Sequence, residues 1–209
     1  MTERPDYLLI LDFEATCNDK EPKPRVQEII EFPTLVLNVK TGEVESEFHH
    51  YINPSEKLTP FCTELTGITQ KVVDGGISIS KALELHKTWV FNDLGLVAHP
   101  SSEGHTFLYC TCGDWDLKRC LPAQLASIGA TVPQHFSQWI NIKIAFGALY
   151  GLKKKKRAKG MVDMLDKLGL ELEGRHHSGI DDCRNIARVA SKMLADGWIP
   201  EATFRKKKK

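Results

Sequence analysis

The chain has 209 residues and a formal net charge of +1, with 42% hydrophobic and 26% charged residues. These values are ordinary for a globular protein and exclude a collagen-like, low-complexity or strongly charged disordered chain. A length near 200 residues suits one domain with a full hydrophobic core. The charge is uneven, because basic residues cluster at 153–159 (KKKKRAK) and at 205–209 (RKKKK).

The start of the chain and the cysteines bear on the compartment. The segment MTERPDY lacks the apolar run of a signal peptide, and no stretch approaches the ~18 apolar residues of a membrane span. The six cysteines form no C-x-x-C pair, which argues against a structural zinc site. We therefore expect no membrane association and an intracellular protein with free thiols, in the cytoplasm, the nucleus or both.

Hydrophobic patterning predicts three strands, then strands mixed with helices, then helices. The run YLLILDF at 7–13 is typical of a strand buried on both faces. Further strands are expected at 29–39, 44–52 and 107–110, the first three of the four forming an antiparallel meander. Helices are expected at 59–65 capped by Thr59, from Ser78 or Ser80 to 91, at 114–128, 141–150 and 160–168, and from about 181 onward.

This order of elements fits an α/β fold with a mixed sheet. We find no internal repeat and no linker that would divide the chain. We therefore expect a single domain at 5–200, followed by a basic tail at 201–209 that is disordered.

Asp12 and Glu14 lie two residues apart at the end of the first predicted strand. Their side chains then share one face, while Leu11 and Phe13 point the other way into the core. Two acids side by side on an apolar strand repel each other and lose hydration, and a bound divalent cation removes that penalty. The alternative is a strand that ends at Asp12 and leaves both acids in a solvated loop.

A third acid lies in the sequence CGDWDL, where a strand ends at Cys112, a glycine allows a sharp turn and a helix begins. Asp114 suits a helix N-cap, because acids are favoured at that end of a helix. Asp116 lies one turn inside and can point back toward the strand ends. We assign the chemistry to Asp116 and the cap to Asp114.

The fourth part is the sequence GRHHSGIDD, a glycine-containing loop with two histidines that runs into a helix. His177 and Asp182 are five residues apart, so a loop residue and a first-turn residue can meet at one site. His176 is the competitor for the role of His177.

Four carboxylates, Asp12, Glu14, Asp116 and Asp182, offer hard oxygen ligands that suit Mg²⁺ or Mn²⁺ better than zinc. Two such ions roughly 3.5–4 Å apart can clamp the attacking and leaving oxygens of a phosphodiester. A histidine with a pKa of about 6.5 is mostly neutral near pH 7 and can take a proton from water. The residues alone therefore predict metal-assisted phosphodiester hydrolysis.

The motifs DFEATC, CGDWDL and GRHHSGIDDCRNIA occur in this order, with LTGIT and QWIN between them. In this combination the chain resembles the DEDDh 3′–5′ exonucleases, and more narrowly the Eri-type exoribonucleases, over residues 7–198. Relatives usually carry proline before the histidine, where this chain has His176, and the five-residue offset to Asp182 selects His177.

The resemblance implies an RNase H-like fold with a central mixed five-stranded sheet flanked by helices. It implies two Mg²⁺ or Mn²⁺ ions on the four carboxylates, and catalysis by His177, as general base, and Glu14. The substrate would be a 3′ end of RNA, single-stranded or overhanging, released as nucleoside 5′-monophosphates. The resemblance also implies these contacts to the terminal nucleotide: Glu14, Ala15, Leu65, Thr66, Ile68 and His177.

Three alternatives remain open at this point. The polymer could be DNA, since contacts to the 2′-hydroxyl cannot be placed from sequence. The chain could be a non-catalytic module that binds RNA or protein, or a metal phosphoesterase for small molecules. The run from Lys153 to Lys159 could bind phosphates or act as a nuclear localisation signal. The oligomeric state is open, and a monomer is compatible with the sequence.

Overall fold

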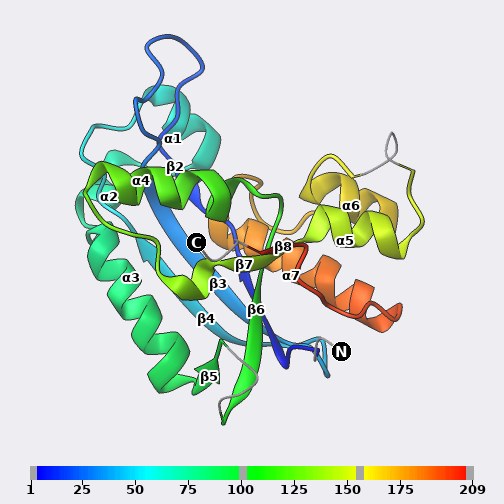
Figure 1. The fold of residues 1–209 in the computed structure, drawn as a ribbon. Helices are drawn as coiled ribbons and strands as arrows, with labels where there is room; N and C mark the ends of the chain where they lie inside the picture. The colour runs from blue at the N-terminus through cyan, green and yellow to red at the C-terminus, as the bar shows by residue number, and fades with distance from the viewer. Residues whose placement is uncertain (1–3, 99–102, 154–157, 206–209) are drawn as a thin grey trace.

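The computed structural model describes residues 4–98, 103–153 and 158–205, and a mixed β-sheet lies at its centre (Figure 1). In these residues the sheet has five longer strands: β1 (Tyr7–Leu11), β3 (Ile29–Asn38), β4 (Val44–Tyr51), β6 (His105–Thr111) and β7 (Gln138–Asn141). Three two-residue strands extend it: β2 (Glu14–Ala15), β5 (Leu96–Val97) and β8 (Phe204–Arg205).

The longer strands lie in the order β4-β3-β1-β6-β7. β3 is antiparallel to both β1 and β4, whereas β6 is parallel to both β1 and β7. The expected meander of the first three long strands and the expected mixed sheet are therefore confirmed. β1 lies in the middle, so the residues directly after Leu11 emerge at the centre of the sheet edge.

The helices cover both faces of the sheet, with α3 and α4 on one side and α5 to α7 on the other (Figure 1). The α-helices of the described residues are α1 (Pro60–Thr66), α2 (Gln70–Asp74), α3 (Ile79–Thr88), α4 (Leu121–Ser127), α5 (Ile142–Leu149), α6 (Met161–Leu168) and α7 (Gly179–Ala195). Two π-helical turns at Trp89–Asp93 and Asp116–Cys120 and a 3₁₀ turn at Gln134–Phe136 complete the list. None of the helices in these ranges has the length and apolar character that a membrane crossing requires.

Alternation along β1 divides the core into two layers. Leu8 and Ile10 pack in the cluster that includes α7, and Leu9 and Leu11 pack in the opposite cluster. Phe13 continues the second series and is 4% exposed. Period-two alternation therefore places the side chain of Asp12 on the α7 side of the sheet.

The predicted helix boundaries and N-caps can be compared with those of the structure. The helix expected at 114–128 is divided into a π-helical turn and α4, because Pro122 at the start of α4 has no N–H to donate. The helix expected to end at 91 is α3, which Ser78 caps by accepting a hydrogen bond from the backbone N–H of Lys81 at 3.2 Å. Thr59 caps α1 as predicted, with a bond of 3.0 Å from Cys62.

The carboxyl-terminal boundary at residue 200 is wrong for the described part of the tail. Phe204 pairs with Trp139 across β7 and β8, and the two rings stack with centroids 4.0 Å apart. The hydroxyl of Thr203 accepts a 2.7 Å hydrogen bond from the backbone N–H of Asn141. Phe204 and Arg205 thus belong to the sheet, and Thr203 is hydrogen-bonded to its edge strand β7, whereas 206–209 lie outside the described residues.

Phe204→Ala should therefore lower the stability of the whole domain. We expect a loss of about 1–2 kcal/mol, because the stacked contact with Trp139 disappears. At about 2–4 °C per kcal/mol for a domain of this size, thermal unfolding followed by circular dichroism detects it. Ile199→Ala is the matched control, since Ile199 is 64% exposed in the same segment. Equal melting of both variants would contradict the assignment of β8 to the sheet.

Candidate active site

Asp12 and Glu14 lie where the central strand is interrupted. β1 ends at Leu11, and the chain resumes as β2 at Glu14, which pairs with Glu31 of β3. Asp12 is half-buried and Glu14 is only 8% exposed. The strand does end before Asp12, as one alternative held, but the acids are not in a solvated loop.

Asp116 joins these acids from the turn after β6. Its carboxylate is buried and accepts a hydrogen bond of 3.0 Å from the backbone N–H of Phe13, the residue between Asp12 and Glu14. Asp114 directly precedes the helical segment, and its backbone carbonyl accepts a hydrogen bond from the N–H of Lys118 at 2.9 Å, as expected at the start of a helix. Its side chain, however, accepts a 3.0 Å hydrogen bond from the indole N–H of Trp139 on β7. The choice of Asp116 over Asp114 agrees with this geometry.

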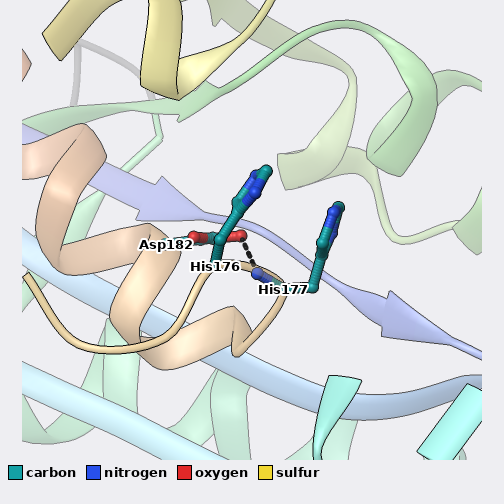
Figure 2. Close-up of side chains that lie close together, drawn as sticks. All are labelled: His176, His177 and Asp182. Atoms are coloured by element: carbon teal, nitrogen blue, oxygen red, sulfur yellow. Dashed lines mark hydrogen bonds between the residues drawn. The ribbon is translucent and has the colours of Figure 1, made fainter. Parts of the chain in front are cut away.

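The fourth segment is the loop that enters α7. His177 has a left-handed backbone with φ 67°, which is uncommon for a residue other than glycine. Its N–H donates a 3.0 Å hydrogen bond to Oδ2 of Asp182 (Figure 2). The imidazoles of His176 and His177 lie side by side, with ring centroids 3.9 Å apart. The spacing of five residues therefore does bring His177 and Asp182 together.

Glu31 determines where α7 begins. Its buried carboxylate accepts hydrogen bonds from the backbone N–H groups of Gly179 at 2.8 Å and Ile180 at 3.2 Å. A carboxylate at this position complements the partial positive charge of the helix end. The helix consequently starts at Gly179 and not near Asp181. Sequence reasoning missed Glu31, although its placement within the predicted strand 29–39 was a signal.

A cavity of about 260 Å³ opens among these segments. Its lining residues are Asp12, Phe13, Glu14, Ala15, Cys17, Gln27, Leu65, Cys112, Trp115, Asp116 and His177. Trp115 is 38% exposed. Its indole therefore contributes an accessible aromatic surface to the wall of the cavity.

Leu65 lies on the cavity wall, whereas two of its neighbours do not. The hydroxyl of Thr66 donates to the carbonyl of Cys62 at 2.8 Å and accepts from the N–H of Ile68 at 3.1 Å. Ile68 is 5% exposed and packs with Ile30 and Cys62. Of the residues expected to contact a nucleotide, Glu14, Ala15, Leu65 and His177 meet at the cavity, and Thr66 and Ile68 serve the packing of α1.

Burial raises the pKa of each clustered carboxyl. The pKa of Asp12 is well above its usual range, mainly through burial and then through the charges of Asp116 and Asp182. Burial and the same repulsion from Asp182 raise the pKa of Glu14 to about 9. Burial also raises the pKa of Asp182 to about 7, although the N–H of His177 acts in the opposite direction. Without a cation, the folded protein thus disfavours the charged forms of these carboxyl groups.

The pKa values of Asp116 and His177 are shifted less than those of the other three groups. Burial raises the pKa of Asp116 to about 6, and the N–H of Phe13 and the charge of Lys143 oppose this shift. Burial lowers the pKa of His177, and the neighbouring imidazole of His176 adds to the effect. His177 is therefore neutral and able to accept a proton at neutral pH.

The donor set fits a divalent metal ion. Oxygens of Asp12, Glu14 and Asp182 lie within 4.8 Å of one another. Among the described residues, Oδ1 of Asp182 is buried and has no hydrogen-bond partner. A buried, unpartnered carboxylate oxygen is costly, and a hard cation such as Mg²⁺ or Mn²⁺ is its natural ligand. His176, His177 and Asp182 form a second close group, in which the imidazole of His176 is exposed.

The basic run beginning at Lys153 adds little to this geometry. Residues 154–157 lie outside the described residues. Lys159 is described, and its carbonyl accepts a 3.3 Å hydrogen bond from the amine of Lys143. Both interpretations of the run, phosphate binding and nuclear localisation, stay predictions.

Asp182→Asn should stabilise the metal-free protein at high pH. The folded pKa of Asp182 exceeds the unfolded value near 4, so the protonated form stabilises the fold below that pH, and the stability is lost as pH rises through about 7. In chelator at pH 8, the variant should exceed wild type by on the order of 2 kcal/mol, and the difference should vanish near pH 4. Thermal melts of both proteins between pH 4 and pH 8 measure the difference, first in chelator and then with added Mg²⁺. A difference that does not change with pH would contradict the prediction.

Comparison with known proteins agrees with the geometry. The family model described as Exonuclease (RNase_T) matches residues 9–190. ERI1 exoribonuclease 3 of Homo sapiens is 46% identical over 205 residues, which cover 97% of this chain and 58% of that protein. The chain thus spans less than two thirds of the length of this relative.

Two solved structures extend the comparison. The nuclease domain of 3′hExo, a DEDDh family member bound to rAMP, has 35% identity and a TM-score of 0.85, covering 96% of this chain and 98% of that one. A structure of a 3′-exonuclease in 3′-end specific recognition of histone mRNA stem-loop has 35% identity and a TM-score of 0.83, covering 97% and 86%. The RNase H-like fold class is confirmed by these neighbours. The chain therefore belongs to the exonuclease family, with ERI1 exoribonucleases as relatives and a DEDDh nuclease as a structural neighbour, as its motifs predicted.

Proposed function

We propose that this protein is a 3′–5′ exoribonuclease that releases nucleoside 5′-monophosphates from RNA 3′ ends with the help of two Mg²⁺ or Mn²⁺ ions. One observation carries the proposal: oxygens of Asp12, Glu14 and Asp182 lie within 4.8 Å of one another, and a buried oxygen of Asp182 has no hydrogen-bond partner in the described residues. Asp116 and His177 line the same cavity as Asp12 and Glu14. Asp12, Glu14, Asp116 and Asp182 would hold the ions. A chain that does not bind cations would gain nothing from gathering buried, mutually repelling carboxylates.

The chemistry follows from the residues around the cavity. When bound, the ions would supply Lewis-acid stabilisation of the charge that develops on the phosphodiester oxygens. The neutral imidazole of His177 takes a proton from the attacking water. The new bond forms between that water oxygen and phosphorus, and the bond from phosphorus to the 3′ oxygen of the preceding nucleotide breaks. The shortened chain leaves with a 3′-hydroxyl, and the terminal nucleotide leaves with its 5′-phosphate.

The cavity suits the end of a chain. At about 260 Å³ it is just below the ~300–1,000 Å³ typical of small-ligand pockets, so one terminal nucleotide fits better than a length of duplex. The side chain of Leu65 and the indole of Trp115 offer apolar surface to a base, and base stacking on aromatic rings is tolerant of sequence. A single-stranded or overhanging 3′ end would enter such a cavity directly.

RNA is the preferred polymer on the names of the relatives. ERI1 exoribonuclease 3 and the histone mRNA stem-loop complex both concern RNA.

The six cysteines are free, which supports an intracellular location in the cytoplasm, the nucleus or both.

Matched RNA and DNA oligonucleotides with a 5′ label test the activity. With Mg²⁺ the RNA should shorten stepwise from its 3′ end, and the ladder should disappear in chelator or with Asp12→Asn, which removes one ligand charge. Faster loss of the DNA strand would favour a DNA exonuclease of the same fold. Absence of a ladder on both polymers would refute the proposed function.

His177→Gln should separate the two histidines. Loss of the proton acceptor should lower kcat by about 10²–10⁴-fold, the usual contribution of a general base. His176→Gln is the matched control and should remain within a few-fold of wild type, because His176 is exposed and does not line the cavity. Single-turnover rates on labelled RNA measure both, and a larger loss in His176→Gln would reverse the assignment.

A further inference from the structure

Arg175 connects two walls of the cavity that come from distant parts of the chain. Its guanidinium Nη2 donates hydrogen bonds to the backbone carbonyls of Glu64 and Leu65, the second at 3.3 Å. These carbonyls belong to the last turn of α1 and lie 111 and 110 residues away in sequence. Leu65 and His177, two residues after Arg175, face the same cavity.

The carboxyl-terminal end of α1 needs such a partner. The last carbonyls of any helix have no N–H donor within the helix, and a cation near them is favourable. Gly67 ends α1 in a left-handed conformation and satisfies Thr63 alone, and α1 has no basic residue in its last turn. A Cβ on Gly67 would lie 3.0 Å from Nε of Arg175, so the guanidinium packs directly on this helix end.

The backbone of Arg175 is fixed just as firmly to α7. Its N–H donates a 3.0 Å hydrogen bond to Oδ2 of Asp181, and its carbonyl accepts one of 3.2 Å from Ser178. The Arg175–Ser178 turn carries His177, whose own N–H is bonded to Asp182. The arginine thus has its backbone in the histidine loop and its side chain on α1.

We infer that Arg175 is a positioning residue that sets the separation between Leu65 and His177, and so the fit of the terminal base in the cavity. The inference rests on the proposed exonuclease function. Arg175 acts through Leu65 and does not touch the substrate. Its removal leaves the carboxylates in place and loosens only the α1 wall.

The test compares substrates with and without a terminal base. With an ordinary RNA 3′ end, Arg175→Ala should lower kcat/KM by about 10–100-fold, since misplacement by about 1 Å can cost that much. With an abasic 3′-terminal ribose, wild type loses the contact to Leu65, and the variant should be within a few-fold of wild type. Equilibrium binding should agree: Arg175→Ala should weaken adenosine 5′-monophosphate and leave ribose 5-phosphate nearly unchanged.

Two further variants and the abasic substrate separate this role from a general structural one. Arg188→Ala removes an arginine that donates to a backbone carbonyl, of Glu171 at 2.7 Å, away from the cavity, and should behave as wild type. Arg175→Lys, which keeps the charge and one donor direction, should recover part of the loss. An equal loss on the abasic substrate would overturn the inference in favour of a general structural role.

A direct phosphate contact has its own signature. If Arg175 bound the RNA backbone, Arg175→Ala would reduce the dependence of log KM on log salt by about one unit of slope, and the inference would be wrong. An unchanged slope supports it. Wild-type hydrolysis with no effect of Arg175→Ala defeats this inference alone, whereas an inactive wild type defeats the proposed function.

Discussion

The carboxylate of Glu31 fixes the amino-terminal end of α7 to the central sheet, and the site depends on this contact. It accepts the N–H groups of Gly179 and Ile180 and also contacts Nε2 of His49 at 2.8 Å. A Cβ on Gly179 would lie 2.9 Å from the carbonyl of Asp12, so only glycine permits so close an approach. Because the helix end meets the sheet at the residue where β1 stops, Asp182 lies beside Asp12 and Glu14.

Backbone amides then hold two of the carboxylates in place. The N–H of Phe13, between the first two acids, holds Asp116, and the N–H of His177 holds Asp182. Each bond favours the charged form of its acceptor, against burial and repulsion that favour the neutral form. The raised pKa values of Asp116, about 6, and Asp182, about 7, show that burial prevails. The amides fix the geometry of the carboxylates, and the remaining electrostatic cost is the one that divalent cations can remove.

Local patterns predicted those parts of the site that depend on short spacings. Alternation in a strand placed Asp12 and Glu14 opposite Leu11 and Phe13, and the five-residue offset paired His177 with Asp182. Contacts between distant segments could not be read in this way. The indole of Trp139 donates a hydrogen bond to Asp114, 25 residues away, and the N–H of Gly179 donates one to Glu31, 148 residues away. Such pairings depend on strand order and helix packing, which one sequence does not specify.

The cavity wall formed by α1 shows the same limit at closer range. Leu65, Thr66 and Ile68 are neighbours in sequence, yet the turn of α1 points only Leu65 into the cavity and commits Thr66 to its own helix end. The Arg175–Ser178 turn is joined to the sheet side through α7 and to this wall through a guanidinium. The acidic cluster is therefore anchored by backbone amides and a buried carboxylate. The wall formed by α1 is held in two ways: Cys62 and Ile68 pack in a buried cluster with Ile30, and the exposed guanidinium of Arg175 binds the carbonyls at the end of the helix. The position of Leu65 consequently depends on a buried packing contact and on a surface hydrogen bond together.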